Sequence, residues 1–537
     1  MAPTKRVTLC TLICITATAQ ALAQETRERL AEASVPTWIF FAPKDVSSSR
    51  LALREQSLEL AARARREWRR TSPGLVDARD LPLRAADVEL VRGIASLRTE
   101  SRWLNAVSVL ASSHQLELLR ALPCVQSTQP VRRGKRASEA CFAIASGMCD
   151  DASSLAVNDG YASRDFYGAA SAQLTQINLP YLHSRGFTGA GVIVAVLDTG
   201  FERQHRCFQN LANPLMVLAE RDFINGDLYT GIQPGDDINQ HGHGTLVLSC
   251  MAAYDPNIYV GAAYSATYVL CKTEDVTSET IVEEDYYAAA IEFAESVGAD
   301  VTTSSLGYID WYTQADLDGR TAITTIALNI AAENGVHACT AAGNGGNDQN
   351  PMTSTLIAPA DALNVLTCGS VNFGGASSEF SSDGPTADGR VKPELLARGE
   401  DTFFAHPHNV TDYVTGSGTS LATPLLAGVV ACLTQAHPEW TVGQMRAALL
   451  TTASDYVQTL TTDPLFVRGY GIVDAGAALQ YGCAADFDGN GGIDGADISA
   501  FFLAWQASEP RGDVNIDGGI DGSDIEAFFI VWTAGGC

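Results

Sequence analysis

The chain has 537 residues, of which 46% are hydrophobic and 18% charged, and its formal net charge is −27. This composition is typical of a folded globular protein of two to four domains, and it excludes a fibrous or wholly disordered chain. The acidic excess repels phosphate, so we expect no nucleic-acid partner.

The first 23 residues predict a secretory signal peptide. Lys5 and Arg6 precede a mostly apolar run over 7–19, and Ala21 and Ala23 place small residues around the cleavage point. The run is shorter than the roughly 20 apolar residues that a membrane span needs. We therefore expect a secreted, periplasmic or cell-surface protein without an integral membrane segment. The 13 cysteines are typical of an oxidising compartment, although their wide spacing is not that of a small disulfide scaffold.

Charge divides the remaining chain. Residues 24–140 carry 20 Lys and Arg against 14 Asp and Glu, whereas residues 141–537 carry 13 against 48. The basic segment predicts a small α+β module, with a strand around WIFFAP (38–43), a long arginine-rich helix around 50–70, a strand in WLNAVSVL (103–110) and a capped helix in SSHQLELLRAL (112–122). It is either removed after folding or kept as a permanent N-terminal domain, and we favour removal.

The middle of the chain alternates strand and helix patterns. Short apolar runs predict buried strands at 191–197, 268–271, 300–306 and 336–342, and helical spacing predicts helices at 283–297 and 321–333. Such alternation predicts an α/β fold in which helices cover both faces of a parallel sheet. Ligands of such folds gather where the strands end at their carboxyl side.

Polar residues stand at these strand ends. Asp198 ends the first strand in VLDTG, Ser305 closes the third in SSLG, and Asn344 closes the fourth in AAGNGG. Ser420 precedes the apolar helix LATPLLAGVVACL, where unpaired backbone N–H groups favour negative charge. Each of these residues by itself is also explained as a helix cap or a turn residue.

Together these segments resemble the subtilisin-like serine proteases, or subtilases. The matching stretches are VAVLDTG, HGHGTLV, SSLGY, AAGN, GTSLATP, FSSDGPTADGRVKPE and residues 167–192, over some 300 residues. The resemblance implies a catalytic triad of Asp198, His243 and Ser420, with Asn344 as an oxyanion donor. His243 is the implied base rather than His241, because the family's histidine directly precedes Gly-Thr. His241 is then a neighbour that is solvated or hydrogen-bonded in the cleft.

The resemblance also implies a strand edge, Ser305, Leu306 and Gly307, that pairs with an extended peptide. Leu421 and Leu246 depart from the family pattern, which leaves the substrate preference open. Residues 24–140 would be an inhibitory prodomain, cut between the basic stretch at 131–139 and about residue 166. Residues 141–482 would be the peptidase domain.

The last 55 residues contain a repeat of period 27, in which residues 485–505 match 512–532. Oxygen-bearing residues recur at loop positions 1, 3, 5, 9 and 12, glycine turns the chain at position 6, and a backbone carbonyl serves at position 7. The predicted calcium ligands are Asp486, Asp488, Asn490, Gly492, Asp494 and Asp497, then Asp513, Asn515, Asp517, Gly519, Asp521 and Asp524.

Aspartate at position 12 and the missing entering helix make residues 483–537 resemble a dockerin. The resemblance implies two Ca²⁺ ions and a cohesin-like partner, and leaves any calcium in the peptidase domain open. A solvated acidic linker is the alternative, but it does not explain why Phe501, Phe502 and Trp505 recur one period later. Cys483 and Cys537 bracket the repeat and could pair as a disulfide.

The predicted protein is thus a secreted serine endopeptidase made as a zymogen. Two alternatives come from other classes. One is an inactive binding module of subtilase shape that is displayed through its tail, although all four catalytic positions are filled. The other is an α/β-hydrolase esterase, in which the serine precedes both the acid and the histidine, whereas here Ser420 comes last.

Overall fold

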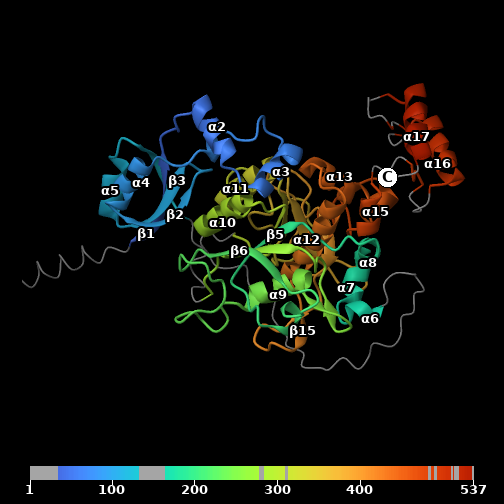
Figure 1. The fold of residues 1–537 in the computed structure, drawn as a ribbon, viewed down its shortest axis with the longest axis horizontal. Coiled ribbons are helices and arrows are strands. Elements are labelled where there is room, and N and C mark those ends of the chain that lie inside the picture. Colours follow the sequence, from blue (N-terminus) through green and yellow to red (C-terminus); the bar gives the residue numbers. More distant parts are fainter. Residues whose placement is uncertain are drawn as a thin grey trace, which may run out of the picture. The chain divides into compact units, whose positions relative to one another are not determined.

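The computed structural model describes residues 34–131, 164–276, 284–308, 312–481, 485–488, 493–509, 512, 514 and 519–534 (Figure 1). The chain separates into two compact units. The first contains residues up to 51 and residues 78–132, and the second contains residues 52–77 and 133–537. The predicted signal peptide and most of the predicted processing region lie outside the described residues.

The first unit is a four-stranded antiparallel sheet with helices on it. The strand order is β2-β3-β1-β4, with β1 hydrogen-bonded between β3 and β4. Alternate residues of β1 and β3, such as Ile39, Val107 and Val109, join Leu116 and Leu119 of α5 in one apolar core. Its elements are β1 (Val35–Phe41), α4 (Ala85–Arg92), β2 (Ser96–Ser101), β3 (Ala106–Ala111), α5 (Ser113–Arg120) and β4 (Val125–Pro130), with α2 (Ser48–Gln56) running across the boundary between the units.

The α+β architecture predicted for this region is confirmed, including the cap of α5. There the Ser112 hydroxyl accepts from the Gln115 N–H, and the Gln115 side chain accepts from the Ser112 N–H. The single long helix predicted around 50–70 is wrong, because α2 ends at Gln56 and α3 (Leu60–Arg69) begins at Leu60. The Ser57 hydroxyl donates to the Arg54 carbonyl, and such local bonds compete with helix continuation.

Helix α3 is part of the second unit, because its arginines are buried in it. Arg65 and Arg66 both contact Glu295 Oε1, the latter through Nε at 2.8 Å, and all three side chains are fully buried. Arg69 pairs with Asp300 at 3.3 Å. Burial lowers the pKa of Arg65 and of Arg69 from the ordinary value, and these carboxylates oppose that shift. The arginines that the sequence assigns to a removable segment are therefore packing residues of the second unit.

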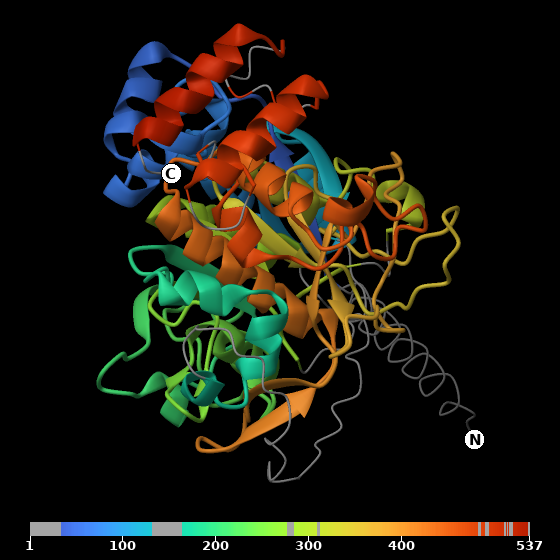
Figure 2. The ribbon, with the colours of Figure 1, turned by 90° about the vertical axis from the view of Figure 1, so that its right-hand side faces the viewer.

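The second unit is built on a seven-stranded parallel sheet with strand order β13-β12-β11-β10-β5-β9-β6. Helices α9 and α12 pack together on one face, and α10 and α11 pack together on the other (Figures 1 and 2). The predicted parallel α/β fold is confirmed. Its strands are β5 (Ile193–Asp198), β6 (Met216–Asp222), β9 (Thr267–Lys272), β10 (Val301–Ser304), β11 (His337–Ala341), β12 (Leu366–Val371) and β13 (Leu395–Arg398).

The remaining elements lie around this sheet or in the tail. The helices are α6 (Arg164–Tyr167), α7 (Ser171–Gln176), α8 (Leu179–Ser184), α9 (Gly242–Ala252), α10 (Glu284–Val297), α11 (Ile323–Glu333), α12 (Thr419–Ala436), α13 (Val442–Thr451), α14 (Tyr456–Thr459), α15 (Ala475–Leu479), α16 (Gly495–Gln506) and α17 (Gly522–Ala534). Two short hairpins are formed by β7 (Tyr254–Asp255) with β8 (Tyr259–Val260), and by β14 (Thr402–Ala405) with β15 (Tyr413–Gly416).

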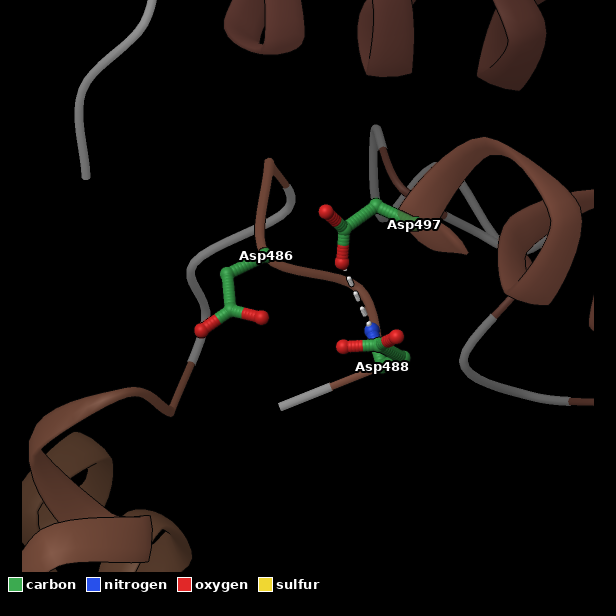
Figure 3. A group of neighbouring side chains, drawn as sticks. All are labelled: Asp486, Asp488 and Asp497. Atoms are coloured by element: carbon green, nitrogen blue, oxygen red, sulfur yellow. Dashed lines mark hydrogen bonds between the residues drawn. The ribbon is translucent and has the colours of Figure 1, made fainter. Parts of the chain in front are cut away.

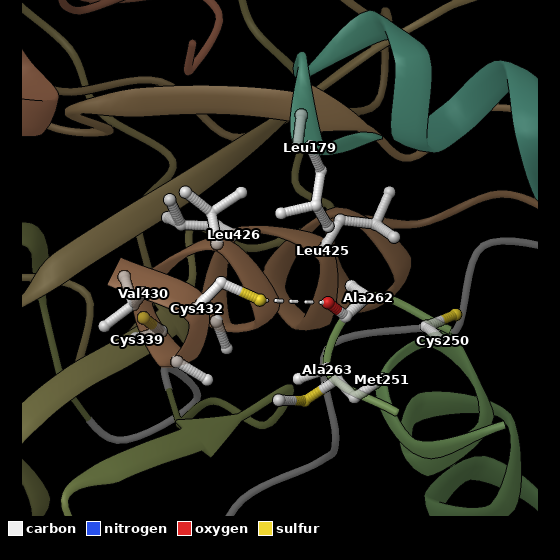
Figure 4. Close-up of a cluster of buried hydrophobic side chains, with 14 of the residues drawn as sticks. Leu179, Cys250, Met251, Ala262, Ala263, Cys339, Leu425, Leu426, Val430 and Cys432 are labelled. Carbon is white, nitrogen blue, oxygen red and sulfur yellow. Dashed lines mark hydrogen bonds between the residues drawn. The ribbon is translucent and has the colours of Figure 1, made fainter. Parts of the chain in front are cut away.

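Helix α12 runs through the core. Leu425, Leu426 and Val430 belong to the same buried hydrophobic cluster as Leu179 of α8 and Met251 of α9 (Figure 4). Among the described residues, α12 is the one helix long and apolar enough to cross a membrane. Since 83% of it is buried inside the structure, its apolar surface is used for core packing.

The described cysteines are free thiols, namely Cys124, Cys207, Cys250, Cys271, Cys339, Cys368 and Cys432. All except Cys124 are buried, and burial raises the pKa of the Cys250 thiol to about 12. Cys432 donates its thiol hydrogen to the Ala262 carbonyl at 3.4 Å (Figure 4). These six residues therefore act as small apolar core residues. Cys483 and Cys537 lie outside the described residues, so their pairing stays a prediction.

Candidate active site

Asp198 and His243 form a buried pair at the carboxyl end of the sheet. Asp198 is the last residue of β5 and is fully buried, and His243 is the second residue of α9 and is 8% exposed. His243 Nδ1 lies 2.8 Å from Asp198 Oδ1, which also accepts the Thr199 N–H at 2.7 Å. An imidazole held in this way donates from Nδ1, so its Nε2 remains available to accept a proton.

Ser420 is the second residue of α12, where its backbone N–H has no partner within the helix. Its hydroxyl donates to the Ser305 carbonyl at 3.2 Å, and the Ser305 hydroxyl donates to the Ser420 carbonyl at 2.9 Å. Ser305 follows β10, and β10 is paired with β5 so that Ser304 lies opposite Leu197. This register brings Ser420 to the same carboxyl end of the sheet as Asp198.

The predicted hydrogen bond between Ser420 and His243 is not formed between these described side chains, because the Ser420 hydroxyl is directed at Ser305. Rotation about the Cα–Cβ bond of Ser420 redirects its hydroxyl. Hydrogen bonds between catalytic groups are often long or misaligned without substrate. The acid–base half of the predicted triad geometry is thus present, and the nucleophile–base contact is absent in this state.

Asn344 lies beside Ser420. Its Oδ1 atom accepts two hydrogen bonds from Thr419, from the backbone N–H and from the hydroxyl, both at 2.9 Å. Because a backbone N–H requires an acceptor, these contacts fix which side-chain atom is the oxygen. The Nδ2 group is then directed away from Thr419, and within the described part of the chain it donates to no protein acceptor. It is a spare amide donor next to a helix start.

Ser305, Leu306 and Gly307 follow β10 instead of continuing it, since the strand ends at Ser304. All three residues are buried. The next residue, Tyr308, pairs with Ala358 in an isolated antiparallel bridge. The strand predicted over 300–306 is therefore shorter than expected, and its last part is a buried extension beside Ser420.

His241, the first histidine of HGHGTLV, is buried, so the solvated position that the sequence analysis allowed for it is wrong. His241 is 7% exposed and precedes α9, and its ring centroid lies 5.5 Å from that of His408. Burial lowers the pKa of His241 from the ordinary value. The hydrogen bond to Asp198 is made by His243 and not by His241, so His241 is not part of the pair described above.

Gln240 holds two segments beside Asp198 and His243 in position, a role that the sequence did not predict. Its Nε2 group donates to the Thr199 carbonyl at 2.6 Å and to the Glu274 carbonyl at 2.5 Å, which ties together the segments after β5 and β9. The one indication in the sequence was its place directly before His241, in the same segment as His243. A glutamine has no chemistry that the motif requires, so sequence alone did not single it out.

A cluster of acidic side chains lies in the first loop of the tail (Figure 3). Asp486, Asp488 and Asp497 each offer a carboxylate oxygen, and these oxygens lie within 4.8 Å of one another. Asp497 Oδ1 also accepts the Asp488 N–H at 3.1 Å. The predicted ligands Asn490, Gly492, Asp513, Asn515 and Asp517 lie outside the described residues.

The two tail repeats pack with internal symmetry. The Phe501 and Phe528 rings stack with centroids 4.3 Å apart, and both are fully buried. Trp505 of the first repeat donates to the carbonyl of Asp521 at 2.8 Å, and Trp532 of the second donates to that of Asp494 at 3.2 Å. Each helix thus closes on the loop of the other repeat.

Comparison with known proteins extends over most of the described chain. The model of the subtilase family matches residues 189–472, and the model of a Peptidase S8 propeptide domain of Bacteroidota matches residues 36–140. Subtilisin E of Bacillus subtilis (strain 168) is 30% identical over 331 residues, which are 62% of this chain and 76% of that protein. Subtilisin of Bacillus pumilus is 32% identical over 308 residues, which are 57% of this chain and 98% of that protein.

The fold is also similar to a solved structure. Fervidolysin from Fervidobacterium pennivorans, a keratinolytic enzyme related to subtilisin, superposes with a TM-score of 0.59 at 21% identity. The match covers 84% of this chain and 61% of that one. By its sequence matches, this chain belongs to the subtilase family and is a serine-type endopeptidase made with a propeptide.

Proposed function

We propose that the protein hydrolyses peptide bonds through a triad of Asp198, His243 and Ser420. The observation that carries this proposal is the buried contact of 2.8 Å between His243 Nδ1 and Asp198 Oδ1. It lies at the carboxyl end of the sheet, where α12 begins and Ser420 is located. Ser420 Oγ attacks the peptide carbonyl carbon while His243 Nε2 takes the hydroxyl proton. The Asp198 carboxylate stabilises the imidazolium that forms.

Collapse of the tetrahedral intermediate breaks the C–N bond, and His243 gives its proton to the leaving amine. Ser420 is then an ester of the acyl fragment. A water molecule, deprotonated by His243, attacks this ester and releases the carboxylic acid and free Ser420. In both steps the negative oxygen would be held by the Asn344 amide and the Ser420 backbone N–H, the donors that have no partner within the described chain.

The propeptide would act as an inhibitor of the peptidase until it is cut away. We place the signal peptide at 1–23, the prodomain at 24–140, the peptidase domain at 141–482 and the tail domain at 483–537, in a secreted protein. The opposite charges of residues 24–140 and of the remaining chain support association of the two before processing.

The tail would bind two Ca²⁺ ions, one in each loop. The carboxylate cluster of Asp486, Asp488 and Asp497 supports the first site, since hard oxygen ligands suit Ca²⁺. Its counterpart is suggested by Asp524, which accepts the Asp521 N–H at 2.8 Å just as Asp497 accepts the Asp494 N–H at 2.7 Å. The dockerin-like repeat suggests a cohesin-like module as partner.

The direct test is labelling with a fluorophosphonate, which reacts with an activated serine. We expect the wild-type protein to be labelled and to hydrolyse casein, and Ser420→Ala to lose both properties and to keep its propeptide. His243→Ala should behave like Ser420→Ala, whereas His241→Ala should keep most of the activity. Labelling that persists in Ser420→Ala would refute the assignment of the nucleophile, and loss of activity in His241→Ala alone would show that the wrong histidine was chosen.

A further inference from the structure

We infer that Ile357 restricts this enzyme to small side chains, namely Gly, Ala or Ser, on the acyl side of the bond it cuts. The inference rests on the proposed function, since it concerns the substrate residue whose carbonyl Ser420 attacks. It assigns a specificity role to a residue that lies in none of the motifs by which the chain resembles the subtilases.

The position of that substrate side chain follows from the groups around Ser420. On one side, Ser305 exchanges hydrogen bonds with Ser420 and leads into Gly307. On the other side, Asn344 is bound to Thr419 and is preceded by Gly343. A peptide with its carbonyl carbon at Ser420 Oγ and its oxygen at the Asn344 amide places the acyl-side residue between these two segments. Its side chain therefore points at the space between Gly307 and Gly343.

Glycine on both walls leaves that space open to a side chain, but Ile357 already occupies it. A Cβ atom added at Gly307 would overlap Ile357 Cδ1 and Cγ1 and would lie 3.1 Å from its Cβ. A Cβ atom added at Gly343 would lie 3.2 Å from the same Cδ1 and Cγ1 atoms. The isoleucine side chain thus contacts both glycine backbones at once, and it is 5% exposed.

The backbone beneath Ile357 is tied to both walls. The Ile357 N–H donates to the Ala342 carbonyl at 3.3 Å, on the Gly343 side. On the Gly307 side, Ala358 and Tyr308 exchange hydrogen bonds of 2.8 and 3.1 Å. Because the side chain is β-branched, it also has little freedom about χ1. The backbone at Ile357 therefore cannot move away from the two glycines without breaking these bonds, and the branched side chain has few other rotamers.

A large substrate side chain would have to displace Ile357, whereas a methyl or hydroxymethyl group does not reach it. A mismatch of one methylene in such a pocket changes kcat/KM by roughly 10–200-fold. An aromatic ring exceeds the available space by several carbons, so we expect selection against it of at least about tenfold.

The test uses two peptide p-nitroanilides that differ only in the residue before the anilide, Ala or Phe. For the processed wild-type enzyme we expect kcat/KM to be higher for Ala than for Phe by at least about tenfold. Ile357→Gly and Ile357→Ala should lower this ratio by about tenfold or more, mainly through faster cleavage after Phe, with the larger effect for Gly. The ratio does not depend on how much of each variant is folded. Ile330→Ala removes a buried isoleucine of α11 and should leave the ratio unchanged.

Mapping of the cuts that the wild-type enzyme makes in denatured casein supplies a second readout that needs no variant. Cuts mainly after Gly, Ala and Ser support the inference, and cuts mainly after Phe, Tyr or Leu overturn it. An unchanged ratio in an active Ile357→Gly enzyme overturns it as well, while leaving the proposed mechanism intact. A processed protein that cleaves neither substrate and takes no fluorophosphonate overturns the proposed function and this inference together.

Discussion

His243 and Asp198 are 45 residues apart in the sequence, yet Nδ1 of one lies 2.8 Å from Oδ1 of the other. The carboxylate is fully buried at the end of β5, and the imidazole is held at the start of α9. In this arrangement the carboxylate fixes the orientation of the imidazole ring and lies next to the positive charge that forms on it during catalysis. The following predictions begin with this pair.

Asp198→Asn should keep the fold and lower kcat by about 10⁴-fold, the loss that this substitution causes in another triad protease. The amide has the size of the carboxylate but lacks the negative charge that stabilises the imidazolium. Steady-state kinetics on a peptide p-nitroanilide measure the loss. Asp237→Asn, which neutralises a partly exposed aspartate in a loop, is the control and should retain kcat. A decrease of less than tenfold would contradict the role of Asp198.

Asn344→Asp should lower kcat by roughly 10²–10³-fold or more with little change in KM, the scale seen when an oxyanion donor is removed from a related enzyme. The aspartate retains the oxygen that accepts from Thr419 and replaces the donating amide with an acceptor. Thr419→Val tests the structural alternative, because it removes the hydroxyl contact to Asn344 and leaves the amide. Equal losses of kcat in both variants would mean that Asn344 acts only through packing.

Glu295→Gln should destabilise the unprocessed protein by about 3–5 kcal/mol, because it leaves the buried guanidinium groups of Arg65 and Arg66 without their carboxylate. The measurement is urea unfolding in a Ser420→Ala background, which avoids self-cleavage. Glu55→Gln removes a half-exposed partner of Arg63 and should cost less than about 1 kcal/mol. If both variants lower the free energy of unfolding by the same amount, the pairing of Arg65 and Arg66 with Glu295 is not buried in solution.

Removal of calcium should unfold the tail. In the Ser420→Ala protein we expect EGTA to change the tryptophan fluorescence, and we expect that change to vanish when Trp505 and Trp532 are both replaced by phenylalanine. Asp497→Asn should bind one Ca²⁺ fewer than the parent in equilibrium dialysis. Glu526→Gln removes an exposed charge from α17 and should bind the same number. Identical calcium counts for Asp497→Asn and the parent would refute the first site.

His183 should make the protein sensitive to mild acid. Burial lowers the pKa of His183 from 6.5 to about 4, and the neutral ring accepts from the Tyr167 hydroxyl at 2.9 Å and donates to the Ala262 carbonyl at 3.0 Å. Below pH 6.5 the unfolded chain takes up a proton that the folded chain refuses until about pH 4. The free energy of unfolding should therefore decrease as the pH is lowered from 6.5 to about 4, and this residue should account for roughly 3 kcal/mol of the decrease.

The check for His183 is urea unfolding at pH 7 and pH 4.5 in the Ser420→Ala background. His183→Gln retains a donor and an acceptor but does not titrate, so it should show a smaller decrease between the two pH values. His437→Gln replaces a partly exposed histidine, and its free energy of unfolding should decrease between the two pH values as much as that of the parent. An unchanged decrease in His183→Gln would exclude this histidine as the source.

The sequence predicted the strands and helices that carry the catalytic motifs. The runs at 191–197 and 336–342 correspond to β5 and β11, and the helix at 283–297 to α10, since long apolar or periodic segments determine their own conformation. It missed β6, β12 and β13. The first is a half-exposed edge strand, and β13 has only four residues, so neither has a pattern that distinguishes it from a loop.

The amino-acid sequence by itself determined which side chains are available for chemistry, because nucleophile, base and acid are residue types set in recognisable local contexts. The tertiary structure decided what fills the space around them. Nothing in the order of residues reveals that Ile357 lies between Gly307 and Gly343, or that the arginines of a basic segment are buried against Glu295. Such contacts form between segments that are far apart in the sequence, and only the folded chain brings these segments together.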